Sequence, residues 1–98
     1  MKNIIQNLDK AFENKLRLGI MSILSVNAST SYNSLKETLE ATDGNLASHL
    51  KHLEKVGYLS VTKSFINRKP NTEYSITESG KAAFEKHLAA LEAIIKGL

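Results

Sequence analysis

The chain has 98 residues, 13 Lys and Arg against 10 Asp and Glu, 42% hydrophobic residues and no cysteine. Such a length makes one domain, the composition is too apolar for a disordered chain, and the lack of cysteine excludes disulfides and thiolate metal sites. Neither a signal-peptide core nor an apolar run of the ~20 residues that a membrane span needs is present, so we expect a cytoplasmic protein without a membrane partner.

Hydrophobic periodicity predicts that the first half of the chain is helical. Asn14 is a good N-cap, and the polar run before Tyr32 is typical of a loop. In chain order the sequence predicts a helix over about 3–13, a helix from Asn14 to about Val26, a loop over 27–31, a short helix over about 33–40 and a tight turn at 41–43.

The next helix is expected over about 43–56. Thr42 precedes it as N-cap, because its hydroxyl can accept a hydrogen bond from an amide of the first turn. Gly57 follows at the position where helices commonly end in left-handed backbone.

Two segments with period-two alternation, 59–65 and 72–76, predict a β-hairpin around a polar, cationic loop at 66–71. Thr77 then caps a last helix over about 78–97. The predicted fold, for residues 1–98 as one domain, is mainly α with a small β-hairpin. It is a winged helix-turn-helix with the wing at about 59–76 and with N- and C-terminal dimerisation helices.

The whole net charge of +3 comes from one stretch of this fold. Residues 42–72 carry five cations and two anions, whereas the remaining 67 residues carry eight of each sign. A neutral domain with a basic helix and a basic hairpin is suited to bind a polyanion, so we expect double-stranded DNA as the partner.

The helix over 43–56 has a leucine side, and its opposite side is small and polar near the N-terminus and cationic further on. Small residues allow close approach to a major groove, Asn can pair with adenine, and Lys favours phosphates. The alternative is an ordinary solvated helix face. The candidate DNA-binding residues here are Thr42, Gly44, Asn45, Ser48, His49, Lys51, His52 and Lys55.

The hairpin adds four candidate DNA-binding residues: Lys63, Asn67, Arg68 and Lys69. Asn67 tolerates the left-handed backbone that turns often need, and a guanidinium on a narrow ribbon can enter a minor groove, where a narrow tract enhances the negative potential. A merely solubilising loop is the alternative.

Apolar stripes at both ends of the chain predict a homodimer, the commonest oligomer. The alternative is that these segments only close the core of a monomer. The residues expected at the interface are Ile4, Ile5 and Leu8 near the N-terminus and Phe84, Leu88, Leu91 and Ile95 near the C-terminus.

Three stretches carry a resemblance to a known family: Thr42–Leu46 with Ser48–Leu50, Leu53–Leu59, and Arg68–Tyr74 with Ile76–Thr77. Together they resemble the winged-helix transcriptional regulators of the MarR and ArsR type, closest to the short, single-domain MarR-like branch. The resemblance implies a homodimeric regulator, with the helix after Thr42 as recognition helix and the loop around Arg68 as wing tip. Asn67 stands where relatives often carry glycine.

Two other classes of function are weighed against this one. His49 and His52 could bind a metal only with a third ligand, and no catalytic motif is present, so we expect no enzyme, no metal and no cofactor. A winged helix that binds protein or RNA instead of DNA is the other alternative, since fold alone does not fix function.

Overall fold

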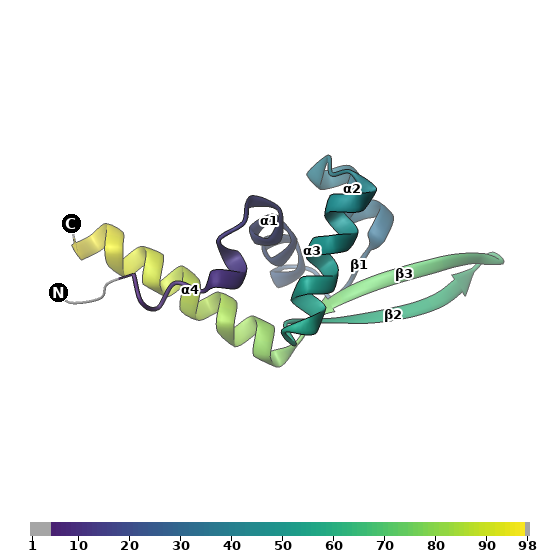
Figure 1. Ribbon diagram of the computed structural model, residues 1–98. Coiled ribbons are helices and arrows are strands. Elements are labelled where there is room, and N and C mark those ends of the chain that lie inside the picture. Colours follow the sequence, from purple (N-terminus) through teal and green to yellow (C-terminus); the bar gives the residue numbers. More distant parts are fainter. Residues whose placement is uncertain (1–4, 98) are drawn as a thin grey trace.

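Four α-helices and a three-stranded antiparallel sheet make up the computed structural model, which describes residues 5–97 (Figure 1). The mainly helical winged helix expected from the sequence is confirmed. Over the described range, no helix combines the length and the apolar character that crossing a membrane requires. The elements are the 3-10 turn η1 (Lys10–Phe12), α1 (Lys15–Ser25), β1 (Thr30–Ser31), α2 (Tyr32–Leu39), α3 (Asp43–Lys55), β2 (Leu59–Ile66), β3 (Lys69–Ile76) and α4 (Glu78–Gly97).

The prediction of a helix over about 3–13 is wrong for the residues that the structure describes. Residues 5–9 form turns and irregular backbone, and only η1 follows. Asp9 accepts a hydrogen bond from the Ala11 amide at 2.9 Å, and Asn14 accepts from two amides of α1 at 3.0 Å. Each side chain caps the start of a new helical element, Asp9 that of η1 and Asn14 that of α1, so these residues cannot form one continuous helix. An N-terminal dimerisation helix is therefore absent from residues 5–13, while Ile4 lies outside the described residues.

The N-terminal segment instead lies against α4 and the end of α3. The Asp9 amide donates to Nδ1 of His87 at 3.0 Å, and the Tyr58 hydroxyl donates to Asp9 Oδ2 at 2.7 Å. Phe12 packs edge-on against Phe84, with ring centroids 5.3 Å apart. Phe84 was expected at a dimer interface, but only 5% of it is exposed, so it belongs to the core of its own chain.

The hydrophobic core lies between α1, α2 and α3. Their apolar faces meet because each helix carries leucine or isoleucine at three- or four-residue spacing. The largest fully buried side chains are Ile20, Met21, Leu24, Leu35, Leu46, Leu50 and Leu53.

The sheet has strand order β1-β3-β2, so β3 is its central strand. The loop expected over 27–31 is wrong at its end, because Thr30 and Ser31 pair with Tyr74 and Glu73 of β3. β2 and β3 are longer than expected and pair from Leu59↔Ile76 to Ile66↔Lys69. The base of this hairpin packs on the core, whereas its tip extends away from the helices as the wing (Figure 1).

Two glycines and a threonine fix the start of α4 against the rest of the domain. Gly57 has φ 87° after the end of α3, as expected from the sequence, and its carbonyl accepts a hydrogen bond from the Thr77 hydroxyl at 2.6 Å. Thr77 also accepts from the Gly80 amide at 2.9 Å. A Cβ at Gly80 would lie 2.2 Å from the Tyr58 carbonyl oxygen, so only glycine fits there.

Candidate nucleic-acid interface

α3 is held with its leucine side in the core and its opposite side in solvent. Leu46, Leu50 and Leu53 are at most 1% exposed. The outward residues singled out from the sequence are exposed, together with three residues of α3 that were not singled out, Asp43, Ala47 and Glu54. The exposed residues of α3 are Asp43, Gly44, Asn45, Ala47, Ser48, Lys51, His52, Glu54 and Lys55.

The turn between α2 and α3 fixes where the exposed face begins. Lys36 Nζ lies 3.0 Å from Asp43 Oδ2, and the Tyr32 hydroxyl donates to Asp43 Oδ1 at 2.9 Å. These two hydrogen bonds, that of Lys36 first, lower the pKa of Asp43. Thr42 accepts from the Asn45 amide at 3.3 Å, as expected of an N-cap. α3 therefore starts at a defined point with its first turn in solvent.

His49 is turned from the exposed face toward α1. Its Nδ1 lies 3.0 Å from Nη1 of Arg17, and Nε of Arg17 donates to the Ala11 carbonyl at 2.6 Å. Burial, and then the charges of Arg17 and His52, lower the pKa of His49. The neutral ring accepts the hydrogen bond from Arg17, so this side chain fixes α3 against α1 rather than projecting with the other candidates.

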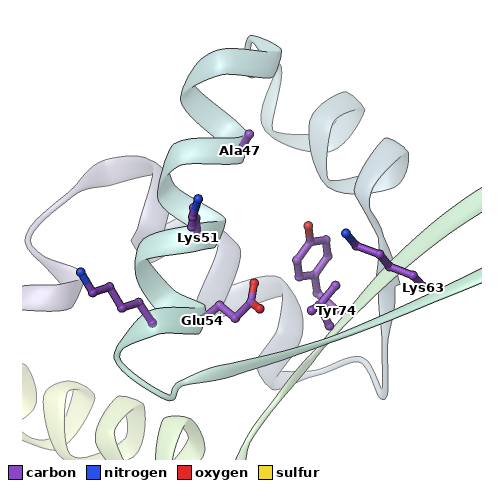
Figure 2. Close-up of a pocket in the computed structure, with 7 residues that line it drawn as sticks. Ala47, Lys51, Glu54, Lys63 and Tyr74 are labelled. Carbon is purple, nitrogen blue, oxygen red and sulfur yellow. The ribbon is translucent and has the colours of Figure 1, made fainter.

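A groove of about 490 Å³ lies between α3 and the wing (Figure 2). Lys63 extends from β2 toward the Tyr74 ring, and Glu54 faces the same ring from α3 (Figure 2). Burial, and then the charge of Glu54, raise the pKa of Tyr74. Three cations and one carboxylate thus border the groove, whose full lining is Ala47, Lys51, Glu54, Lys55, Val61, Lys63 and Tyr74.

The groove contains residues that sequence reasoning missed. Ala47 could have been found, because it shares a helical stripe with Lys51, Glu54 and Lys55 at steps of three and four residues. Tyr74 could not, since its place opposite Val61 depends on the strand register.

The wing ends in a two-residue turn. Asn67 and Arg68 have φ 52° and 65°, and the flanking residues Ile66 and Lys69 are paired. Left-handed backbone at Asn67 was expected, but the same conformation at Arg68 was not. Two left-handed residues make the turn whose twist matches that of paired strands. Of the five candidate cations, Lys51, Lys55 and Lys63 border the groove, and Arg68 and Lys69 stand at the wing tip.

Within residues 5–97, no three His, Asp or Glu side chains gather in a way that could hold a metal ion.

Comparison with known proteins identifies the family. Residues 16–95 match the family described as "Winged helix DNA-binding domain". The chain belongs to this family. The match confirms the resemblance, noted from the sequence, to single-domain winged-helix regulators of the MarR type.

Relatives of this winged-helix protein include chains of nearly the same length. An uncharacterized protein of Methanocaldococcus jannaschii, MJ0432, is 35% identical over 89 residues, which are 91% of this chain and 97% of that protein. A transcriptional regulator homologue from Pyrococcus horikoshii OT3 is 31% identical with a TM-score of 0.89, covering 99% of this chain and 97% of the other. HlyU from Vibrio cholerae is 27% identical with a TM-score of 0.63, covering 87% and 91%.

Proposed function

We propose that this winged-helix protein is a sequence-specific transcriptional regulator, a repressor, which binds duplex DNA as a homodimer in the cytoplasm. The observation that carries the proposal is the cationic groove between α3 and the wing, bordered by Lys51, Lys55 and Lys63. The groove adjoins a helix face of small and polar residues. A phosphate-lined strand seated in the groove would place that face at base edges.

α3 is the element suited to the major groove. Nothing lies within 4 Å of a Cβ built on Gly44, so the first turn is open to close approach. Asn45 and Ser48 are exposed on the same turns and can bond base edges, while Lys51 and Lys55 neutralise phosphates.

The wing is suited to the adjacent minor groove. Asn67, Arg68 and Lys69 are exposed at the end of a ribbon that extends away from the helices (Figure 1). A narrow minor groove attracts an inserted arginine because its negative potential is enhanced. If about five cations each neutralise one phosphate, log K falls with log[salt] at a slope of about −4.5 per protomer.

α4 supports the homodimer. Its buried side holds Phe84, His87 and Ala90, which leaves a second apolar stripe in solvent. Leu88, Leu91 and Ile95 of that stripe are 46%, 37% and 73% exposed. Near the N-terminus, Ile5 is 67% exposed as well, and the first described residues lie beside α4 (Figure 1). Covering this stripe with a second copy removes apolar surface from water.

A two-fold dimer would set its two α3 helices about one DNA turn apart, ~34 Å, and would favour a pseudo-palindromic site. A dimer seated on such a site excludes polymerase from the same DNA, which is the steric basis of the proposed repression.

The proposal is tested by selecting random duplexes for binding and sequencing the bound pool. The expected result is a pseudo-palindromic site with half-sites one helical turn apart. Asn45→Ala and Ser48→Ala should relax the preference at individual positions, at about 1–3 kcal/mol per lost base contact. Ser22→Ala, an exposed serine of α1, is the matched control and should leave the selected site unchanged.

No enrichment of any duplex, or enrichment only of hairpins in a parallel selection from random RNA, would contradict the proposed function. Leu91→Glu should convert the dimer to a monomer in a mass measurement, whereas Val26→Glu, at an apolar residue 79% exposed at the end of α1, should not.

A further inference from the structure

The wing tip carries exposed apolar side chains beside its charged ones. Phe65 is 76% exposed and Ile66 is 51% exposed, although both are large apolar residues. They are neighbours in β2 and therefore point to opposite faces of the hairpin. The strand register sets Phe65 opposite Pro70 and Ile66 opposite Lys69. Phe65 and Pro70 thus form an apolar pair on one face.

The face that carries Phe65 is the one that borders the groove. Residues of β2 alternate between faces, so Val61, Lys63 and Phe65 share one. Val61 and Lys63 line the groove opposite α3. The groove-lining surface therefore continues along the wing from Tyr74 at its base to the Phe65–Pro70 pair near its tip.

The charge around this pair favours a polyanion as the occupant. Residues 60–72 contain three cations and no Asp or Glu. The next carboxylate along β3, that of Glu73, belongs to the opposite face, because Glu73 pairs with Thr62. It accepts hydrogen bonds from Ser29 at 2.8 Å and from Asn71 at 3.1 Å. Of the three cations, Lys63 shares the face of Phe65, Arg68 stands at the turn, and Lys69 lies with Ile66 on the opposite face. An apolar pair near the wing tip with cations and no carboxylate beside it matches a duplex, which has apolar sugars and base stacks behind its phosphates.

We propose that Phe65, supported by Pro70, is an apolar wedge that enters the minor groove of the bound duplex and partly unstacks one base step. The inference rests on the proposed DNA-binding function and adds a contact that is independent of charge. Inserted apolar side chains kink duplexes toward the major groove. Pyrimidine–purine steps unstack most easily, so the wedge also adds a sequence preference where the wing meets the DNA.

Phe65→Ala is compared with Ile66→Ala, the adjacent exposed apolar residue on the opposite face, using the full chain and the selected duplex. Affinity is measured by fluorescence anisotropy at several salt concentrations. Unstacking is read from a 2-aminopurine placed at the base step under the wing. Both side chains are exposed, so the melting temperatures should match that of the wild type.

The expected result is roughly tenfold weaker binding for Phe65→Ala, as for loss of one buried aromatic side chain, with an unchanged salt slope and loss of the 2-aminopurine signal. Ile66→Ala should bind within about twofold of the wild type.

Three results would overturn the wedge while leaving the DNA-binding function intact. The first is wild-type affinity and unstacking in Phe65→Ala. The second is an equal loss in both variants. The third is a Phe65→Ala protein whose mass in solution changes while its DNA affinity does not. That result would show that the wing tip contacts a second copy of the chain. A wild-type protein that binds no duplex would overturn both the wedge and the proposed function.

Discussion

Replacing Arg68 by glycine should stabilise the protein and weaken its binding to DNA at the same time. Arg68 has φ 65° at the second position of the wing turn, where such hairpins favour glycine. Left-handed backbone costs a residue with a Cβ roughly 1–2 kcal/mol. Glycine removes that cost but loses up to about 1 kcal/mol of extra chain entropy on folding. The net gain is about 0.5–1 kcal/mol, which raises the melting temperature of a domain of this size by roughly 2–8 °C.

The loss of binding follows from the missing charge. One phosphate contact fewer should make the slope of log K against log[salt] shallower by about 0.9 per protomer. Loss of the minor-groove guanidinium should also lower affinity by about 1–3 kcal/mol, as for other specific arginine contacts. Urea denaturation measures the first effect, and fluorescence anisotropy on the selected duplex at several salt concentrations measures the second.

Arg68→Lys is the control, because lysine keeps the positive charge and, having a Cβ, the same cost of left-handed backbone. It should leave stability unchanged and retain the salt slope. The reasoning would be refuted if Arg68→Gly melted below the wild type, or if it bound DNA with the same affinity and the same slope.

Further predictions concern stability. Gly80→Ala should cost about 3 kcal/mol in urea denaturation, because its Cβ would meet the Tyr58 carbonyl, whereas Gly44→Ala, with open space around it, should cost nothing; equal effects would contradict this packing. The hydrogen bond to Asp9 raises the pKa of the Tyr58 hydroxyl to about 12. The stability that this hydrogen bond gives the folded protein is therefore fully present below about pH 10 and is lost as the pH rises toward 12. In an absorbance titration Asp9→Asn should lower that pKa. Burial lowers the pKa of His49. The stability that the neutral His49 ring gives the folded protein is therefore fully present above about pH 6.5 and is lost at lower pH. His49→Gln should reduce the difference in stability between pH 7.5 and pH 5.

Local chemistry made most of the fold predictable. Thr42 and Thr77 cap helices that begin at the next residue, because a hydroxyl cap depends only on a few neighbouring amides. The N-terminal helix failed for a related reason, since Asp9 and Asn14 both act as caps. The two-residue strand at Thr30 was missed, because pairing with β3 creates it and no pattern of that length is visible in the sequence.

The candidate site, too, was predictable from the sequence only in part. The outward face of α3 follows from the spacing of its leucines, so Gly44 and Lys51 could be placed from the sequence. The direction of His49 could not, because Arg17, 32 residues earlier, decides it. Phe84 was assigned to a partner because its stripe is apolar, and only the packing of Phe12 shows that the chain covers it itself.

The central claim is that one surface, formed by α3 and the wing, receives the duplex. Titrating isotope-labelled protein with the selected duplex and following its backbone amide resonances by NMR tests this most directly. The account predicts that the largest shifts fall within residues 42–55 and 63–69, with small changes on the exposed stripe of α4. Shifts concentrated on α1 or α4, with the wing and α3 unaffected, would contradict it.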